Sequence, residues 1–597
     1  MEEIKKRLAE FRAAMKGAGI AAAIIPQTDA HLGEYIADHW QVRRWLSGFT
    51  GSAGTLVFTP SETLLWTDSR YFLQAAEQLE RTGITLMKDG LPGTPSIASY
   101  LADNLVKGST VGLDGKLFAT TEIAELRAKL EKHGLNLNTH FDPIDTLWTD
   151  RPELPSAAVF IHEEKFAGRS AADKIRDTLA QVREQGAEAM FVSGLDEIAW
   201  VLNIRSSDVK RTPVATAFLY LSPKGSTLFI KEEKVSREVR DYLGAIGVGV
   251  RPYDAALPVL NALPDSTTVL VEAPRTSQAV IDALGARAVF GASPIIALKA
   301  VKNRVQIDGV RRAMEHDGAA LVHALMEIER RMGAGNTLTE LDIEEILTRH
   351  RSAQPYYFDD SFDTIAGYGP HGAIVHYSAT PESASTLKPE GLLLIDSGAQ
   401  YLWGTTDITR TIALGTPTPE EKRDFTLVMK GHIALATAIF PEGTRGGQLD
   451  ALARQFLWRE GLSYLHGTGH GVGHFLSVHE GPQSIRLNDV PYALQPGMLT
   501  SNEPGLYRAG VHGIRCENLV LTVPAFTTEF GNFYRFETMT LCPFDLSLFD
   551  TAMMTPREIE WVNGYHAEVA RRVSPLLEES ARQWLAEKTR PLEKVKG

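Results

Sequence analysis

Cysteine is scarce in this chain: the 597 residues include only Cys516 and Cys542. Two cysteines argue against a disulfide framework, and reduced thiols fit the cytosol better than an oxidising compartment. The N-terminus, MEEIKKRLAEFRAAMKGAG, alternates charged with apolar residues and lacks the apolar segment of a signal peptide. The most apolar early stretch, Ala18 to Pro26, is far too short to span a membrane. We therefore expect a soluble cytoplasmic protein with no membrane partner.

Basic charge is also in short supply, with 61 Lys and Arg against 74 Asp and Glu, a net charge of −13. A nucleic-acid binder would show a basic stripe, so we expect no nucleic-acid partner. The proportions of 44% hydrophobic and 23% charged residues are ordinary for a globular protein. A chain of this length exceeds one hydrophobic core, so roughly two to four domains are expected.

The first half of the chain contains the same pattern twice. In each copy an amphipathic helix leads into an apolar strand, a Trp-containing helix and a hairpin with Pro, Ser and Gly at its bend. The segments are 2–17, 20–25, the helix at Trp45 and the hairpin from Gly54, then 170–185, 189–192, the helix at Trp200 and the hairpin from Ala217. We predict two similar α/β domains over residues 1–158 and 159–299, with Pro143, Pro152 and Pro155 marking the first joint.

A third domain of α+β type is predicted over residues 300–597. It opens with helices, because apolar residues recur every three or four positions and a further helix begins near Thr339. After Phe362 the apolar period becomes two, which predicts mainly strands as far as Leu541. A helix is expected between the strands over 451–460, and the tail over 556–590 is expected to be helical and amphipathic.

Five acidic or imidazole side chains in the third domain lie in distinctive local sequence frames, each rich in glycine or typical of a strand. They are Asp396 in LLLIDSG, Asp407 in TTDITRT, His470 in HGTGHGVGH, Glu503 in SNEPG and Glu517 in GIRCENLVL. Four carboxylates and one imidazole suit two hard or borderline divalent cations held side by side. A single Asp or Glu of this kind is usually a solvated or capping residue, but five in such frames predict a metal centre.

Asp396 and Asp407 lie in a strand, turn and strand pattern, with a separation of 11 residues. An odd separation fits a hairpin in which the two face each other directly, with Cβ atoms about 5 Å apart. Two metals in a hydrolytic site lie about 3.5–4 Å apart, which is a similar scale. A pair of turn-flanking aspartates remains an alternative. Against it, Asp396 ends an all-apolar strand, where a carboxylate without a partner is costly.

The histidine-rich loop around His470 alternates its histidines with glycines, which let the backbone approach a ligand closely. It lacks the Gly-Lys-Ser/Thr ending of a phosphate loop and the His-Glu-x-x-His pattern of single-zinc peptidases. Glu503 is presented at the end of a short strand, beside the turn that Pro504 begins. Arg515 and Glu517 would share one face of a strand, so Arg515 can orient the glutamate or a substrate carbonyl; a surface ion pair is the alternative reading.

The order Asp, Asp, His, Glu, Glu in these frames resembles the pita-bread metallopeptidases, which include methionine aminopeptidases, prolidases and aminopeptidase P. Several sequence segments resemble the three-domain cytosolic aminopeptidase P subgroup, and the resemblance covers essentially the whole chain. These segments are RRWLSGFTGSAGTLVFT, NIRSSDV, GAIVHY, HGVGHFLSVHEGPQ and EPGLY. The resemblance implies two creatinase/prolidase N-terminal-type domains followed by a pita-bread catalytic domain.

The resemblance also implies a role for each site residue. Two divalent ions, most often Mn(II), would be bridged by Asp396 and Glu517, with Asp407 on one ion and His470 with Glu503 on the other. His376, His466 and His479 match the non-ligand histidines that contact substrate and stabilise developing charge. Tyr507 and Arg515 match positions that support the ligands and the substrate.

The implied activity is removal of the N-terminal residue from peptides with proline at position two. As a hypothesis, a water shared by two ions becomes a hydroxide near neutral pH and attacks the scissile carbonyl. Glu503 would accept its proton, and His479 or His376 would stabilise the oxyanion. Proline has a fixed ring and no amide proton, so an apolar pocket is needed, for which Tyr377 and Phe475 are candidates.

Three other functions stay open at this point. A prolidase, which cleaves only Xaa-Pro dipeptides, would share every metal ligand. A catalytically inactive binding module would be expected to lose ligands, and metal-free creatine hydrolysis is disfavoured by their presence. Relatives with three domains are commonly homodimers, so we expect a homodimer and regard Trp458 as a candidate interface residue, although plain core is the commoner role of such an aromatic.

Overall fold

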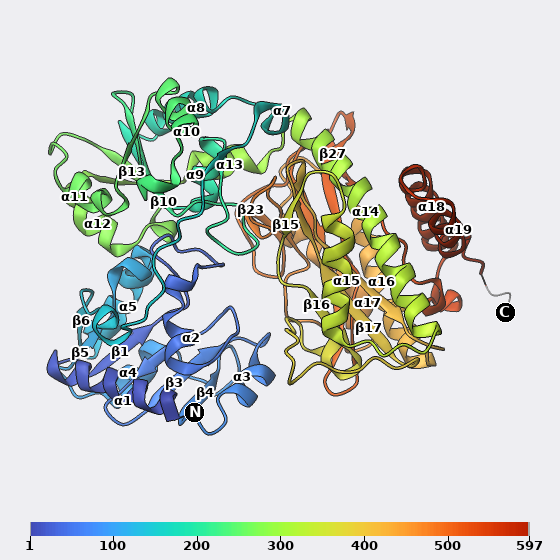
Figure 1. The fold of residues 1–597 in the computed structure, drawn as a ribbon, viewed down its shortest axis with the longest axis horizontal. Coiled ribbons are helices and arrows are strands. Elements are labelled where there is room, and N and C mark those ends of the chain that lie inside the picture. The colour runs from blue at the N-terminus through green and yellow to red at the C-terminus, as the bar shows by residue number, and fades with distance from the viewer. Residues whose placement is uncertain (1, 595–597) are drawn as a thin grey trace. The chain divides into compact units, whose positions relative to one another are not determined.

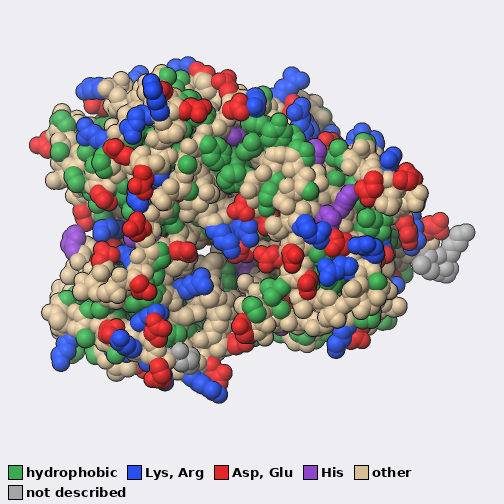
Figure 2. Space-filling view, viewed as in Figure 1, with side chains coloured by type: hydrophobic (Ala, Val, Ile, Leu, Met, Phe, Trp, Pro, Cys, Tyr) green, Lys and Arg blue, Asp and Glu red, His purple; other side chains and the backbone are tan. Residues whose placement is uncertain are grey.

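The computed structural model describes residues 2–594, which form two compact units (Figure 1). The first unit ends at Ile295 and leaves out Glu163–Gly168; the second consists of that short segment and the chain from Ile296 onwards. No helix within residues 2–594 combines the length and apolarity that crossing a bilayer requires. On the face drawn in Figure 2, acidic and basic side chains are intermingled, with no basic stripe.

The first half of the first unit is a six-stranded sheet in the order β4-β3-β2-β1-β5-β6. Strand β1 pairs antiparallel with β2 and parallel with β5, and its residues are all buried. The strands are β1 (Ala22–Ile25), β2 (Thr55–Phe58), β3 (Thr63–Thr67), β4 (Ile84–Lys88), β5 (Thr110–Gly112) and β6 (Asn136–Asn138). The helices are α1 (Glu2–Gly17), α2 (Val42–Ser47), α3 (Phe72–Gln78), α4 (Ile97–Asn104), α5 (Thr120–Lys132) and α6 (Ile144–Leu147).

The second half repeats this topology in a sheet of order β12-β11-β10-β8-β13-β14. Its central strand β8 again pairs antiparallel with the first hairpin strand, β10, and parallel with β13. The strands are β8 (Ala189–Val192), β10 (Ala217–Leu221), β11 (Ser226–Ile230), β12 (Val248–Arg251), β13 (Val269–Val271) and β14 (Ala288–Phe290). The helices include α8 (Ala171–Glu184), α9 (Leu195–Val201), α10 (Arg237–Ala245), α11 (Ala256–Asn261) and α12 (Gln278–Leu284). The prediction of two similar α/β domains is confirmed.

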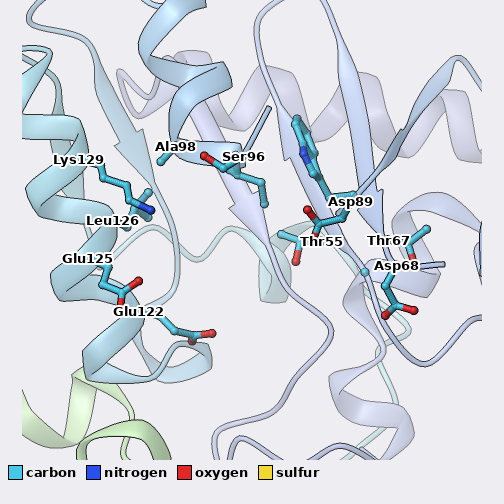
Figure 3. A pocket seen from close by; sticks show the side chains of 13 residues that line it. Thr55, Thr67, Asp68, Asp89, Ser96, Ala98, Glu122, Glu125, Leu126 and Lys129 are labelled. Carbon is cyan, nitrogen blue, oxygen red and sulfur yellow. The ribbon is translucent and has the colours of Figure 1, made fainter. Parts of the chain in front are cut away.

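A cavity of about 420 Å³ opens in the first sheet domain beside α5 (Figure 3). Glu122, Glu125 and Lys129 line it from one face of α5, as their spacing of three and four residues requires. Trp66 of β3 also lines the cavity and donates its indole N–H to the backbone oxygen of Pro95 at 2.9 Å. Glu122 also accepts the Ala119 N–H at 3.0 Å, so part of this acidic lining serves to cap the helix.

The second unit is built on long helices and several short sheets. Helix α14 packs against α15, and α16 against α17 (Figure 1). These helices are α14 (Arg304–Gly333), α15 (Glu340–Ser352), α16 (Pro419–Ala436) and α17 (Gly446–Arg459), followed at the end by α18 (Pro556–Val573) and α19 (Glu579–Lys588). Helix α15 begins near Thr339, as the sequence predicts, and Thr339 caps it by accepting the Asp342 N–H.

The second unit contains several sheets, and the predicted metal ligands lie in or next to their strands. One six-stranded sheet has the order β21-β28-β27-β24-β22-β23, and a three-stranded sheet has the order β16-β17-β20. Their strands are β21 (Ile439–Pro441), β22 (Gly469–Gly471), β23 (Glu480–Ile485), β24 (Leu499–Asn502), β27 (Asn518–Thr528), β28 (Gly531–Thr538), β16 (Ile365–Tyr368), β17 (Leu392–Ser397) and β20 (Ile408–Ala413). Smaller sheets contain β15 (Tyr357–Asp360), β18 (Ala399–Tyr401) and β19 (Gly404–Thr405), and the hairpin of β25 (Gly505–Arg508) and β26 (His512–Arg515).

Strands dominate between Phe362 and Leu541, as the sequence predicts, but helix α16 within this part was not predicted. Its start signals are present, because Thr418 accepts the Glu421 N–H and Pro419 occupies the first turn. The helix is nearly enclosed, however, and every residue from Asp424 to Met429 is buried. An enclosed helix has no polar face, so its apolar run has the same appearance as a buried strand.

Candidate metal centre

The five predicted ligands come from five separate places in the second unit. Asp396 is in β17, Asp407 precedes β20, His470 is in β22, Glu503 follows β24, and Glu517 lies between β26 and β27. Ligand atoms of Asp407, His470 and Glu517 lie within 4.8 Å of one another. Nε2 of His470 is 3.5 Å from Oε1 of Glu503, and the charge of Asp396 acts on both Glu503 and Glu517. The structure therefore brings all five together.

Asp396 and Asp407 do not face each other directly, so that prediction is wrong. In the β17–β20 ladder Asp396 pairs with Thr409, two residues beyond Asp407. The intervening chain leaves the ladder at Gly398 and forms the β18–β19 hairpin, which belongs to another sheet. A Cβ on Gly398 would lie 2.1 Å from the Thr406 oxygen, so only glycine allows this departure. The two aspartates remain diagonal neighbours on one face, where side chains still reach each other.

His470 is held by its own loop as well as by the acidic groups. Its backbone N–H donates to Oγ of Ser501 at 2.9 Å, and Nδ1 lies 2.9 Å from the Gly471 oxygen. Nε2 therefore faces Asp407, 3.4 Å away, and Glu503. A Cβ on Gly469 would lie 2.0 Å from the Ser501 oxygen, so glycine lets β22 approach this neighbour.

Thr409 and Arg515 connect the two bridging candidates. Oγ1 of Thr409 donates to Glu517 at 2.8 Å and accepts from Nε of Arg515 at 3.1 Å. Nη2 of Arg515 donates to Asp396 at 2.5 Å. Arg515 and Glu517 are not on one strand as expected, because β26 ends at Arg515 and β27 begins at Asn518. Arg515 thus orients Asp396 directly and Glu517 through Thr409, and it is buried rather than part of a surface ion pair.

The acidic cluster is electrostatically frustrated. Burial raises the pKa of Asp396 above its usual range, and neighbouring Asp407 raises it further although Arg515 opposes this. Burial likewise raises the pKa of Glu503, and that of Glu517 lies well above normal through burial and the charges of Asp407 and Glu503. Burial alone would lower the pKa of His470, but the bond to Asp407 and the charge of Glu503 raise it to about 9. Such mutual repulsion is what bound cations relieve.

The donor atoms fit divalent metals. Oδ1 of Asp396 and Oε1 of Glu517 are buried and have no hydrogen-bond partner among residues 2–594. Unpaired buried oxygens are costly, and both belong to the carboxylates expected to bridge two ions. The oxygen-rich set with a single imidazole suits ions such as Mn(II) better than soft metals.

Histidines predicted to contact substrate lie beside this cluster. The ring of His479 is 4.5 Å from that of His470, in a perpendicular arrangement. Nε2 of His466 lies 2.8 Å from the hydroxyl of Tyr507, which accepts from Nη1 of Arg515 at 2.8 Å. Burial raises the pKa of Tyr507 to about 12, so the phenol stays protonated at neutral pH.

The remaining predicted substrate contacts are His376, Tyr377 and Phe475. His376 is half-buried and follows Val375, whose backbone oxygen accepts from Arg515 at 3.5 Å. Tyr377, a candidate for the proline pocket, is buried and donates its hydroxyl to Glu340 at 2.9 Å. Phe475, the other candidate, is fully buried, with the ring of Phe358 5.2 Å away.

Two supporting residues were missed at the sequence level, Thr409 and Ser501. Ser501 donates to Glu503 at 3.1 Å and accepts the His470 N–H, so it joins β24 to the histidine loop. Both are strand residues two positions from a predicted ligand that lies just beyond the strand end, in TTDITRT and SNEPG. Period two places such residues on the ligand's face, which is the signal that could have identified them.

Comparisons with known protein families agree with this layout. The family model for metallopeptidase family M24 matches residues 308–524, and the one for its C-terminal region matches 532–592. Two models of the creatinase/prolidase N-terminal domain match residues 7–147 and 150–306. The domain limits at residues 158 and 299 stay predictions beside these matches.

Individual relatives match over nearly the full length. Aminopeptidase P2 of Arabidopsis thaliana is 42% identical, covering 97% of this chain and 87% of its own. A probable Xaa-Pro aminopeptidase P of Coprinopsis cinerea is 39% identical, covering 99% of both. The crystal structure of X-prolyl aminopeptidase from Caenorhabditis elegans, described as a cytosolic enzyme with a di-nuclear active site, superposes with a TM-score of 0.92 at 34% identity, covering 96% of this chain and 95% of the other.

Proposed function

Because this chain belongs to metallopeptidase family M24 and is a Xaa-Pro aminopeptidase with a di-nuclear metal site, we propose that the cluster around Asp407 is that site. The observation that carries the proposal is the convergence of Asp407, His470 and Glu517 within 4.8 Å. The unpaired buried oxygens of Asp396 and Glu517 support it. Removal of the first residue from peptides with proline at position two is the activity that this site performs.

Each ligand has a proposed place. Asp396 and Glu517 would bridge the two ions, Asp407 would complete one of them, and His470 with Glu503 would complete the other. We propose Mn(II), because the donors are mostly hard carboxylate oxygens. Bound divalent ions would supply the positive charge that lowers the pKa of a shared water toward neutrality.

Glu503 is the proposed proton acceptor. One of its oxygens, Oε1, accepts from Ser501 at 3.1 Å, so the carboxylate has a fixed orientation. Oε2 is then the atom that takes the proton from the attacking water and delivers it to the leaving proline nitrogen.

The histidines and Tyr507 are proposed to bind and polarise the substrate. His479, against the ring of His470, and His376 would donate to the oxygen of the scissile carbonyl as negative charge develops there. Tyr507 links Arg515 to His466 through hydrogen bonds of 2.8 Å each, and these two bonds fix the imidazole of His466. Arg515 holds Asp396 at the same time, so ligand and substrate positions depend on one guanidinium.

The direct test is Glu503→Ala in protein loaded with Mn(II), assayed by release of arginine from Arg-Pro-Pro. Loss of a general base lowers turnover by about 100-fold or more. Metal content measured on the same samples separates loss of the base from loss of metal. Unchanged turnover would refute the assignment. Cleavage of Xaa-Pro dipeptides alone, with tripeptides intact, would favour prolidase activity instead.

Assembly and location complete the proposal. We propose a homodimer, supported by the 44% exposed side chain of Trp458 on α17. Light scattering that shows only the 65.6 kDa chain would contradict it. A cytoplasmic location is supported by two free, buried cysteines and by the cytosolic C. elegans relative. Fractionation that finds the protein outside the cytosol would contradict this location.

A further inference from the structure

A second cavity, of about 350 Å³, lies in the second unit, and none of the five proposed metal ligands lines it. Helix α7 (Glu164–Ala167) packs against the start of α14, where Asn303 donates to the Ala167 oxygen at 2.9 Å (Figure 1). Three aromatic residues line the cavity, Phe166 from α7, Tyr356 before β15, and Trp403 from the β18–β19 turn. Asp308 and Arg312, one turn apart on α14, contribute charge.

The three rings form a continuous aromatic wall. Tyr356 lies between the other two, with ring centroids 5.4 Å from Phe166 and 4.7 Å from Trp403. His316 stacks behind Trp403 at 5.2 Å. Tyr356 is nonetheless 48% exposed, an unusual state for an aromatic so closely surrounded by rings. Exposed aromatic surface in a concavity is typical of a ligand site.

The backbone at Tyr356 is strained in a way that places its ring in the cavity. Its φ is +60°, a conformation that costs about 1–2 kcal/mol for a residue with a side chain. The carbonyl of Tyr356 is fixed in place because it accepts the Leu402 N–H at 3.0 Å. Strain of this kind is retained where the side chain has a task, and clusters at ligand clamps.

The charges at the cavity favour an anion. Asp308 is already paired with Arg311 at 3.1 Å, and Lys165 with Glu163 at 2.7 Å. Arg312 is exposed and has no ion-pair or hydrogen-bond partner among the residues that the structure describes. A guanidinium binds a carboxylate through two parallel hydrogen bonds, and aromatic faces beside it accept a flat ring.

We propose that this cavity is a second small-molecule site that binds an aromatic carboxylate, with its ring against Tyr356 and Trp403 and its carboxylate on Arg312. The proposed site uses none of the five metal ligands. N-acetylphenylalanine is a suitable probe, because its blocked amine makes it no substrate for an aminopeptidase. For a ligand of this size a dissociation constant on the order of 1 mM is expected.

The test is calorimetric titration of the Mn(II)-loaded protein with N-acetylphenylalanine and with its neutral amide. Arg312→Gln should weaken binding of the acid about tenfold and leave the amide unchanged, because only a charge-assisted pair is lost. Arg330→Gln is the matched control, since Arg330 is also exposed on α14 but lies about 27 Å further along it. Hydrolysis of Arg-Pro-Pro should stay the same in both variants.

A second variant separates binding from folding. Tyr356→Gly removes the ring while relieving the positive φ, so stability should hold or rise as binding is lost. Failure of the wild-type protein to bind the acid at a concentration about ten times the expected dissociation constant would overturn the proposal. It would equally fail if Arg312→Gln and Tyr356→Gly bound the acid as the wild type does, or if benzylamine bound and the acid did not.

Discussion

At the scale of single residues, Thr409 is the least conspicuous part of the metal centre and one of its main supports. Its hydroxyl donates a hydrogen bond to Glu517 and accepts one from Nε of Arg515. It also lies opposite Asp396 in the ladder, so one small side chain contacts both proposed bridging ligands. The ligands themselves could be predicted from their sequence motifs. Thr409 has no distinctive signature of its own, and only its spacing of two residues from Asp407 connects it with the site.

Replacement of Thr409 by valine keeps the shape and removes the hydroxyl. Glu517 then loses a donor while still buried, and Arg515 loses an acceptor, so the geometry for metal loosens. Loss of such support typically lowers metal affinity or activity by about 10–100-fold. Titration of the metal-free protein with Mn(II), followed by the Arg-Pro-Pro assay at saturating metal, measures the two effects separately.

Thr411→Val supplies the control for that experiment. Thr411 is on the same strand and face and is also buried, but its hydroxyl bonds the backbone of Arg515 rather than a carboxylate. We expect a smaller change in Mn(II) affinity for it. Equal effects of the two substitutions would mean that the strand, not the contact with Glu517, determines metal binding.

At the scale of elements, the parts that the sequence did not predict are those that tertiary contacts impose. The β18–β19 hairpin leaves the β17–β20 ladder because Thr405 and Gln400 bond the Leu476 oxygen in the histidine loop. No local pattern encodes that partner 71 residues away. The paired strands around Asp396 were predicted correctly as elements, but their register depends on this hairpin.

Helix α16, which was not predicted, fixes the β25–β26 hairpin that carries Tyr507 and Arg515. Asp424 of α16 accepts two bonds from Arg508, at 2.5 and 2.9 Å, and lies 3.0 Å from Nε2 of His512. Asp424→Asn should lower the free energy of unfolding by about 1–3 kcal/mol, the worth of hydrogen bonds to a charged group. It should also lower turnover, since Arg515 loses its fixed position.

The effect of Asp424 depends on pH with a definite sign. Burial raises the pKa of Asp424, but bonds from Arg508 and His512 outweigh this and hold it below its ordinary value of 3.8. The stabilisation is therefore present above that ordinary value and is lost as pH falls through the lowered pKa. Urea unfolding at pH 7 and in acid should show the difference between wild type and Asp424→Asn shrink. Glu420→Gln is the control, because Glu420 reaches Arg508 only at 3.7 Å and is 58% exposed.

At the scale of the whole molecule, the sequence predicts the domain organisation and which part of the chain holds the metal ligands. The duplicated helix, strand and hairpin pattern corresponds to two sheets with the same strand order, and local periodicity is enough to predict that. Each of these sheets has its own core, and all five proposed ligands lie in the second unit. Metal binding should therefore stabilise one unit and leave the other nearly unaffected.

Scanning calorimetry with and without Mn(II) tests this separation. Metal that binds only the folded state stabilises it by about 2.7 kcal/mol at 100 times the dissociation constant, which shifts the midpoint by roughly 5 °C or more. Removal of metal with a chelator should lower the transition of the second unit alone. In Glu517→Gln a proposed bridging carboxylate is missing, so added Mn(II) should give little shift. A shift of the first unit's transition, or an undiminished response in Glu517→Gln, would place the stabilising metal outside the carboxylate cluster.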